Sequence, residues 1–454
     1  MKKLLLLLSV FSFCNSLSAT HNTAGEISLR QLDYKKYEVH LITYTNSASI
    51  PADRDSLFLC WGDGICEWIP RDTFSFVDCN VKHNIYKKTH TYDSEGEYTV
   101  SMTDPNRNAA ILNLGLFANN IPFHLQTKHK VTSDWNNTPI LLNLPPLEAM
   151  VNQTVKHNPA AIDLEGDSLA YSFIIPYQGL DSQIPNYTFP DDLGSSGNDN
   201  LIIQSEFGTM IWEAPSMLGA YTIAILITEY RDGQIISETI RDFEIRINIA
   251  THEAPILNTP FNEITLSVGD SLEFQVDGED PDNDNILIEA FGLPFMLNGP
   301  ASFSISPFYF SSPNSGVLSW KITNDHILTD PYYVVFRIED ETNNNCGLTS
   351  YEVLKISIND PPTNVEELEE TTFSITPNPV VSQELVLHLN NIFSNNDLNY
   401  KIINMDSKVI KTGQLPASQN QYRINTIDIP NGIYSLVLFS NNHYFSEKFI
   451  VLKN

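Results

Sequence analysis

Apolar and polar positions alternate over short segments along most of this 454-residue chain. Runs rich in β-branched and aromatic residues, such as 36–45, 221–228, 332–340 and 351–360, are bounded by Asn, Asp, Gly and Pro. Such runs are typical of β-strands separated by turns. Outside the first residues, no window of eleven or more residues keeps a helical period. The pattern therefore predicts an all-β chain of about four consecutive β-sandwich domains.

The middle of the chain contains an internal repeat. Four segments recur in the same order at an offset of about 108 to 117 residues: 138–146 with 254–262, 163–171 with 280–288, 208–212 with 316–320, and 221–229 with 333–341. Repeated order at a near-constant offset predicts two copies of one fold.

Interruptions of the strand pattern give the domain boundaries. Pro, Asn and Thr break it at "SDWNNTP" and "IATHEAP", and a proline pair followed by glutamates indicates a solvated tether. The predicted order is a signal peptide at 1–19, a first sandwich at 20–135, repeat copies at 136–251 and 252–360, an acidic linker at 361–372 and a last sandwich at 373–454.

The first residues carry the signals of secretion. Two lysines precede an apolar run from Leu4 to Phe13, and small residues follow at 16–19. These are the three regions of a secretory signal peptide. Cys14 follows the bulky Phe13, so attachment of a lipid is disfavoured, and no later run reaches the roughly 18 apolar residues of a membrane helix. We expect export through the periplasm.

Charge is distributed unevenly. Residues 373–454 contain six Lys/Arg and five Asp/Glu, so the preceding 372 residues contain 20 basic and 50 acidic side chains, a formal charge of −30. Such a surface repels phosphate backbones, which argues against a nucleic-acid partner.

Three cysteines, Cys60, Cys66 and Cys79, crowd into the first domain, whereas Cys346 lies far away in sequence. In an oxidising compartment a disulfide among the first three is expected, and the spacing leaves the pairing open. Zinc is the weaker interpretation, because there is no Cys-x-x-Cys pair and no histidine at ligand spacing.

The first domain contains a turn motif with a candidate aromatic partner. Its residues are Gly62, Asp63 and Gly64, followed by His90, Tyr92, Gly96 and Tyr98. Glycines allow a tight turn, Asp63 can accept backbone N–H groups, and a tyrosine near a bend can bond back to the chain. Nothing nearby supplies a nucleophile, so a structural role is favoured over catalysis. The pattern resembles the PKD (polycystic kidney disease) domain, a seven-stranded sandwich, with a departure in the insertion 65–89.

Clustered carboxylates in both repeats are the candidate metal ligands. They are Asp280, Asp282 and Asp284 in the second copy and Asp163, Glu165 and Asp167 in the first. Calcium takes six to eight hard oxygens, and an extended segment would place alternate side chains on one side. The alternative is a solvated turn with local hydrogen bonds. The repeats resemble cadherin-like bacterial surface domains, which implies calcium near domain junctions, where Glu229, Glu339 and Asp340 would add oxygens.

Tryptophans divide into two groups. Trp212 and Trp320 occupy the same place in both copies, which predicts a role in the core. For Trp61, Trp68 and Trp135, which have no repeat partner, a binding surface remains open.

The last 82 residues have a distinct pattern of short strands and turns. Its marks are a Pro377-Asn378-Pro379 start, Tyr400-Lys401-Ile402 with Asn404 and Gly413, an Asn431-Gly432-Ile433-Tyr434 turn, and a final strand ending at Lys453. This pattern resembles the type A sorting domain of the type IX secretion system. The resemblance implies transfer across the outer membrane by that machinery, with cleavage expected in the linker 361–372.

Motifs of catalysis are missing from the sequence: there is no Gly-x-Ser-x-Gly, no His-Glu-x-x-His and no phosphate-binding glycine loop. We therefore expect a secreted or cell-surface protein without enzymatic activity, in adhesion, surface structure or gliding. The alternative is a glycan-binding or hydrolase-accessory protein, and an enzyme with an unrecognised carboxylate pair comes third. The extracellular glycan or protein ligand is not identified by the sequence.

Overall fold

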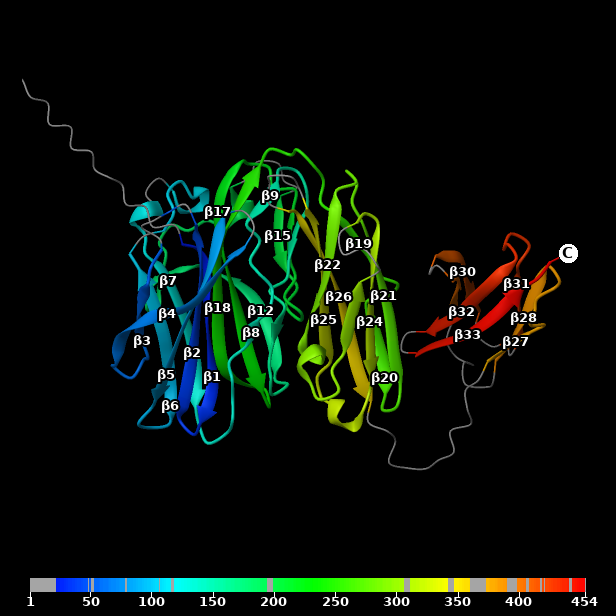
Figure 1. Cartoon of the computed structure of the whole chain (residues 1–454), viewed down its shortest axis with the longest axis horizontal. Helices are drawn as coiled ribbons and strands as arrows, with labels where there is room; N and C mark the ends of the chain where they lie inside the picture. Colours follow the sequence, from blue (N-terminus) through cyan, green and yellow to red (C-terminus); the bar gives the residue numbers. More distant parts are fainter. Residues whose placement is uncertain are drawn as a thin grey trace, which may run out of the picture. The chain divides into compact units, whose positions relative to one another are not determined.

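The computed structural model describes residues 22–47, 49, 53–77, 80–105, 107–115, 118–193, 199–305, 311–341, 347–359, 373–389, 398–405, 408–416, 419, 421–440 and 443–453. The expected signal peptide 1–19, Cys79, Cys346 and the acidic linker 361–372 lie outside these residues. Within them, strands dominate, and the helical segments are single 3₁₀ turns of three or four residues. The predicted all-β fold is confirmed (Figure 1).

The chain divides into two compact units. The first comprises residues 1–255 with 280–285 and 339–351, and the second comprises 256–279, 286–338 and 352–454. Two short segments of the second repeat therefore belong to the first unit.

The first domain is an antiparallel sheet in the order β1-β2-β5-β4-β3-β6-β7. Alternating side chains such as Leu29, Leu41 and Val100 turn inward to a buried core. The strands are β1 Asn22–Asp33, β2 Lys36–Asn46, β3 Ser56–Cys60, β4 Cys66–Val77, β5 Val81–Thr91, β6 Gly96–Asp104 and β7 Phe123–Val131.

The segment 65–89, expected as an insertion, supplies β4 and most of β5. β4 pairs with β3 and with β5, and β5 pairs with β2 along eleven residues. A register shift between Arg71 and Thr73 bends β4 between its two partners. The segment is therefore part of the sheet itself.

The first repeat continues the sheet of the first domain. Its longest strand, β18, pairs with β17 and also with β7 and β1. Its strands are β8 Ile140–Leu141, β9 Glu148–Met150, β10 Val155–His157, β11 Ala161–Ile162, β12 Ser168–Ile174, β13 Tyr177–Gly179, β14 Ser182–Gln183, β15 Asn200–Ile203, β16 Met210–Glu213, β17 Gly219–Arg231 and β18 Gln234–Asn248. Its core includes Ala24 and Tyr44 of the first domain. One sheet therefore continues across the boundary at 135/136, whereas the first domain also keeps a core of its own.

A buried ion pair joins the two domains. The guanidinium of Arg241, on β18, donates from Nη2 to Glu26 Oε1 at 2.7 Å and from Nε to Glu26 Oε2 at 3.2 Å. Both side chains are shielded from solvent. Arg107 and Asp242 form a second buried pair a residue further along β18. Because water cannot reach these charges, each depends on its partner and on nearby hydrogen bonds for stabilisation.

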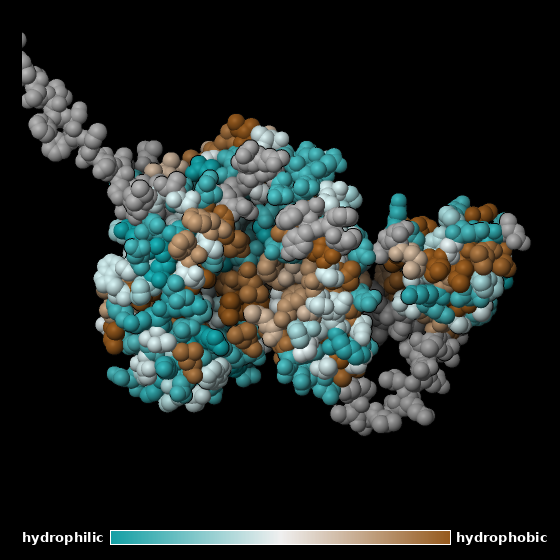
Figure 2. All heavy atoms as spheres, in the orientation of Figure 1, coloured by the Kyte–Doolittle hydropathy of each residue, from teal (hydrophilic) through white to brown (hydrophobic). Residues whose placement is uncertain are grey.

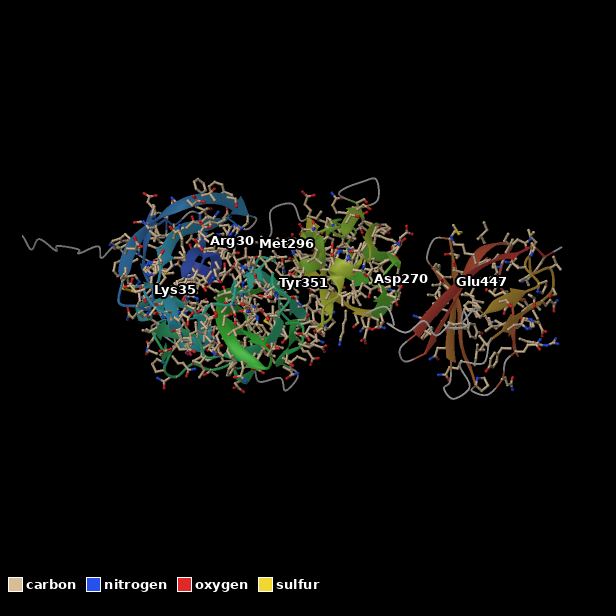
Figure 3. The ribbon with its side chains drawn as sticks, turned by 90° about the horizontal axis from the view of Figure 1, so that it is seen from below. Arg30, Lys35, Asp270, Met296, Tyr351 and Glu447 are labelled. Carbon is tan, nitrogen blue, oxygen red and sulfur yellow. A yellow bond between two sulfur atoms is a disulfide. The ribbon has the colours of Figure 1, made fainter. Side chains whose placement is uncertain are left out.

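Residue Tyr351 also belongs to the first unit (Figure 3). Its hydroxyl accepts a hydrogen bond from Asn143 Nδ2 at 3.0 Å, and its ring meets His157 edge-on with centroids 5.9 Å apart. Since Arg241 Nη1 donates to the Asn143 carbonyl, Tyr351 contacts the same buried network.

The second repeat is a sandwich of two four-stranded sheets, β19-β21-β24-β23 and β20-β26-β25-β22. Phe274, Leu318 and Phe336 fill the space between them. The strands are β19 Ile256–Asn258, β20 Glu263–Ser267, β21 Ser271–Glu279, β22 Asn285–Phe291, β23 Ser302–Ile305, β24 Asn314–Lys321, β25 Tyr332–Glu341 and β26 Thr349–Asn359.

The C-terminal domain has its own core between the sheets β27-β28-β31 and β30-β29-β32-β33. Leu387, Ile402 and Leu436 are buried there. The strands are β27 Ser374–Thr376, β28 Glu384–His388, β29 Leu398–Asn404, β30 Val409–Leu415, β31 Gln421–Asn425, β32 Gly432–Ser440 and β33 His443–Val451.

Replacing Glu26 by Gln should leave Arg241 buried without a counter-charge. We expect a loss of about 3 to 5 kcal/mol in the free energy of unfolding, measured by urea denaturation. Glu26→Leu with Arg241→Met should recover most of it, because an apolar pair carries no desolvation penalty. The exposed pair Arg423 and Glu384 is the control, and Glu384→Gln should change the stability by less than about 1 kcal/mol.

The buried His129 on β7 gives the first domain a pH dependence. Its Nε2 lies 3.0 Å from the Tyr92 hydroxyl, and its ring packs against Tyr37 with centroids 4.9 Å apart. Burial lowers the pKa of His129 to about 3. The folded chain therefore keeps this ring neutral at pH values where an exposed histidine is protonated.

In the unfolded chain, the pKa of His129 returns to about 6.5. Below about pH 6.5 the unfolded state binds a proton that the folded state does not, so this ring should lower the stability by about 1.4 kcal/mol per pH unit. In His129→Gln, the urea midpoint should fall less between about pH 6.5 and 5 than in the wild type. An identical pH dependence in both proteins would contradict a buried neutral ring.

Candidate functional site

The turn motif of the first domain is a closed hydrogen-bonded unit. Asp63 Oδ1 accepts the Ile65 N–H at 3.0 Å, and its Oδ2 lies 2.7 Å from His90 Nε2. Gly62 has φ +89°, and a Cβ there would lie 2.7 Å from the backbone of Thr99. The motif needs glycine for this close approach, and the Asp63 carboxylate holds the turn against β5.

The aromatic rings that accompany this turn stack on one another in pairs. His90 stacks on Trp61 with centroids 4.6 Å apart, and Tyr92 stacks on Tyr98 at 4.2 Å. The Tyr92 hydroxyl donates to the Trp61 carbonyl, and the Tyr98 hydroxyl donates to the Ser94 carbonyl close to Gly96. These contacts pin strands to one another, as the structural interpretation of the sequence predicts.

A disulfide joins Cys60 and Cys66. The two residues are directly paired across β3 and β4, so the bond closes the hairpin that carries Gly62, Asp63 and Gly64. The spacing in sequence left this choice open among three cysteines.

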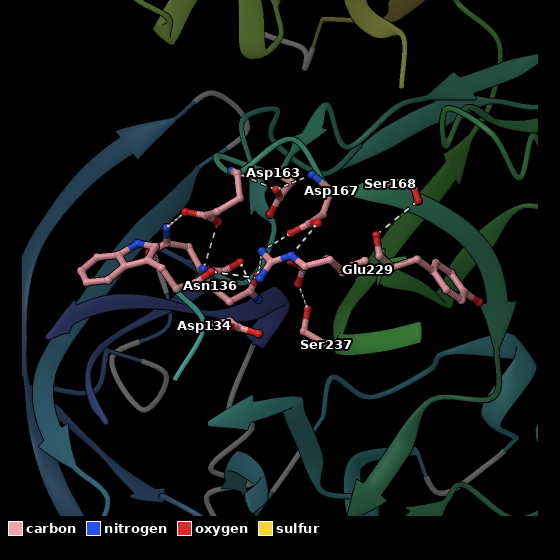
Figure 4. Close-up of polar contacts among 12 residues, drawn as sticks. Asp134, Asn136, Asp163, Asp167, Ser168, Glu229 and Ser237 are labelled. Atoms are coloured by element: carbon pink, nitrogen blue, oxygen red, sulfur yellow. Dashed lines mark hydrogen bonds and ion pairs between the residues drawn. The ribbon is translucent and has the colours of Figure 1, made fainter. Parts of the chain in front are cut away.

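The acidic turn of the first repeat is organised by Asp163. Its Oδ1 accepts the N–H groups of Glu165 at 2.9 Å and Asp167 at 2.8 Å. Glu165 is directed to Asn137, whose N–H donates to Oε2 at 3.0 Å. Asp167 pairs with Arg231, whose Nε donates to Oδ1 at 2.9 Å. The three predicted ligands therefore face different partners (Figure 4).

Glu229, near the end of β17, completes a different set of carboxylates. One oxygen each of Asp163, Asp167 and Glu229 lies within 4.8 Å of the others. Burial, together with the charge of Asp163, raises the pKa of Glu229 to about 9, and burial raises the pKa of Asp163 to about 6. The other oxygen of Glu229 accepts the hydroxyl of Ser237. The sequence suggested Glu229 only through the cadherin-like resemblance.

The acidic turn of the second repeat has the same beginning. Asp280 Oδ1 accepts the N–H groups of Asp282 and Asp284, both at 2.9 Å. The segment is a turn and is not extended, because β21 ends at Glu279 and β22 begins at Asn285. Among the described residues, Asp280, Asp282 and Asp284 do not form a convergent ligand group.

Asp340 occupies the strand end in the second repeat. Burial, and then the charges of Asp280 and Asp284, raise its pKa to about 7. Its Oδ1 accepts the N–H of Leu348, and its Oδ2 lies 3.6 Å from His252 Nε2. The carboxyl group of Asp340 therefore has the His252 ring beside it, whereas that of Glu229 lies close to two other carboxylates.

Some tryptophans lie in the core and others lie on the surface. Trp212 and Trp320 are buried, as predicted from their repeated positions, and Trp61 is buried as well. Trp68 and Trp135 remain exposed, at 65% and 49%. Only these two have faces available for a ligand.

The C-terminal motif residues secure the last strand from two sides. Asn378, between Pro377 and Pro379, accepts the Ile450 N–H at 3.0 Å and donates to the Lys448 carbonyl at 3.2 Å. Asn431 does the same to Lys453, accepting its N–H at 2.7 Å and donating to its carbonyl at 2.9 Å.

Lys453 and Tyr434 complete this arrangement. The Lys453 ammonium donates to the carbonyls of Thr426, Ile427 and Ile429. The Tyr434 hydroxyl donates to the Pro430 carbonyl at 2.9 Å, across the turn that contains Gly432. The residues that define the motif thus fix β33 and the end of the domain in place.

Sequence reasoning missed the residues that contact these sites from elsewhere in the chain. Arg231 lies far in sequence from Asp167 of the acidic turn, to which it donates, and Ser237 donates to Glu229. Phe58 is paired with Trp68 across β3 and β4. No local pattern marks such residues.

In the described part of the chain, no helix is both long and apolar enough to cross a membrane.

Comparisons with known proteins found one matching family and several solved structures with low similarity to this chain. No curated protein matches the chain. Solved structures include the BIgI domain of beta protein from S. agalactiae bound to CEACAM1, with 14% identity and TM-score 0.18, covering 24% of this chain and 98% of that one. The zebrafish RET cadherin-like domains 1 to 4 show 9% identity and TM-score 0.17, covering 96% of this chain and 97% of that one.

Residues 374–452 match the family described as "Secretion system C-terminal sorting domain". The match spans β27 to β33, including Asn378, Asn431 and Tyr434. This confirms the sorting domain predicted from the sequence. The chain is therefore a multidomain β-sandwich protein whose residues 374–452 match the secretion-system C-terminal sorting domain family, which indicates export by the type IX system.

Proposed function

We propose that this chain is a non-enzymatic secreted or cell-surface protein that acts in adhesion, surface structure or gliding. The observation that carries the proposal is the sorting domain at 374–452, which addresses the preceding sandwiches to the outside of the cell. Residues 1–372 carry a large excess of acidic side chains. This excess supports a soluble protein at the cell surface, because like charges keep copies of the chain apart.

Export in this proposal has two steps. The leader 1–19 takes the chain to the periplasm, and the sorting domain then engages the outer-membrane machinery. Separate cores support this division of labour, since the sorting domain buries its own apolar residues. The linker 361–372 is the proposed cleavage region, because a proline pair followed by glutamates is a sequence typical of a solvated tether.

Exposed apolar side chains on the sorting domain are candidates for contact with the secretion machinery. Figure 2 shows hydrophobic residues on the face of this domain that is in view. Ile433 and Ile450 are paired across β32 and β33 and are both exposed. Exposed apolar pairs of this kind favour protein contacts.

Deleting residues 373–454 should leave the passenger in the periplasm, because the signal for the second step is removed. Cell fractionation and immunoblotting of the medium measure this outcome. Glu384→Gln, a surface change in the sorting domain, is the control and should be exported normally. Normal release of the truncated chain would contradict the proposed route.

A second candidate function is glycan recognition by the first domain. Leu57 and Ile69 are buried, so alternation turns their neighbours Phe58 and Trp68 outward. The two rings face each other across β3 and β4 with centroids 5.4 Å apart. Exposed aromatic faces suit the apolar faces of sugar rings.

If this second function holds, Trp68→Ala should lower glycan binding at least tenfold on an array of polysaccharides. Phe76→Ala is the matched control, because Phe76 is 68% exposed on the same strand and its ring contacts Phe74, whereas the Trp68 ring contacts Phe58. Equal loss in both variants, or binding unaffected by Trp68→Ala, would favour the adhesion proposal without a sugar platform.

A further inference from the structure

Two carboxylate oxygens in the first repeat are buried without a hydrogen-bond donor. They are Asp163 Oδ2 and Glu229 Oε1, and no donor from the described residues reaches either of them. Asp163 is 4% exposed and Glu229 is 0% exposed. A buried carboxylate oxygen without a partner is costly and rare in folded proteins. The pair therefore indicates a missing binding partner.

The charges around these oxygens favour a divalent cation. Asp163, Asp167 and Glu229 bring three negative charges when ionised, and Arg231, which pairs with Asp167, brings one positive charge. A dipositive ion would neutralise the net negative charge that remains. Arg231 donates to both oxygens of Asp167, whereas Asp163 and Glu229 each keep one oxygen without a donor for the ion.

The donor set selects a hard ion. The group contains oxygen ligands alone, without histidine or cysteine, which suits calcium, magnesium or manganese. Calcium lies about 2.3 to 2.6 Å from its ligands, so a single ion bridges oxygens up to about 5 Å apart. The ligand atoms here lie within 4.8 Å of one another. Magnesium demands a stricter octahedron, which makes calcium the better fit.

We propose that Asp163, Asp167 and Glu229 bind one calcium ion in the first repeat. Waters complete its coordination, since one oxygen from each of the three carboxylates is fewer than the six to eight oxygens that calcium takes. The acidic turn of the second repeat, despite its richer sequence, is not part of this site. There the strand-end acid Asp340 faces His252, and its turn residue Asp282 accepts the Glu253 N–H.

Occupancy of this site bears on the joint between the first domain and the first repeat. Arg231 donates to Asn136 Oδ1 at 2.6 Å and to the Trp135 carbonyl at 3.1 Å. Asn136 in turn donates from its backbone N–H to Gln31 on β1 at 2.8 Å. An ion that fixes Asp167 therefore also fixes Arg231 and the segment that follows β7.

Calorimetric titration of the full chain, after treatment with chelator, tests the proposal with CaCl2 and MgCl2 as probes. We expect one calcium per chain, a weaker response to magnesium and a higher thermal midpoint with calcium. Metal analysis of the dialysed protein should give the same stoichiometry. No binding of either ion would overturn the proposal and would indicate that Asp163 and Glu229 share a proton instead.

Variants locate the ion. Glu229→Gln keeps the size of the side chain, removes its charge and should weaken calcium binding at least tenfold. Asp280→Asn, at the equivalent turn position of the second repeat, should bind as the wild type does. Calcium binding that survives Glu229→Gln, or is lost in Asp280→Asn, would overturn the assignment. If Glu229→Gln does not fold, Asp167→Asn replaces it with the same expectation.

Discussion

The buried pair of Glu26 and Arg241 is the constraint on which the first unit depends. It lies where β1 meets β18, the place where the sheet of the first domain continues into the first repeat and where Ala24 and Tyr44 enter the core of that repeat. Two charges removed from water require each other, and any separation of the strands would expose one of them unpaired. The pair therefore specifies how two sandwich sequences fuse into one sheet, and Asn143 extends the network to Tyr351.

The two repeats show how one turn diverges. Asp163 and Asp280 each accept two backbone N–H groups in the same geometry, which explains why the aspartate recurs. Their surroundings differ near the end of a later strand, where Glu229 on β17 lies close to Asp163 and Asp340 on β25 lies beside His252. The same turn is therefore surrounded by different charged groups in the two repeats. A richer run of carboxylates in sequence does not by itself bring oxygens together, because turn residues point to separate partners.

The sorting domain is self-contained in a way that suits its role. Its core is built from its own strands, and Asn378, Asn431 and Lys453 tie β33 to the start of the domain and to the turn before β32. These bonds run from side chains to backbone, so they depend on residue identity at a few positions. That is why a short set of residues identified the domain from sequence.

The sequence by itself determined the all-β class, the duplicated repeat, the turn at Asp63 and the sorting domain. Each of these rests on local alternation, turn chemistry or ordered short motifs, which operate between near neighbours. Tertiary structure alone decided that 65–89 forms strands, that Cys60 pairs with Cys66, that β18 joins two domains, and that Glu229 meets Asp163 and Asp167. These outcomes depend on strand order and on contacts between residues distant in the chain, and such contacts leave no periodic trace in the sequence.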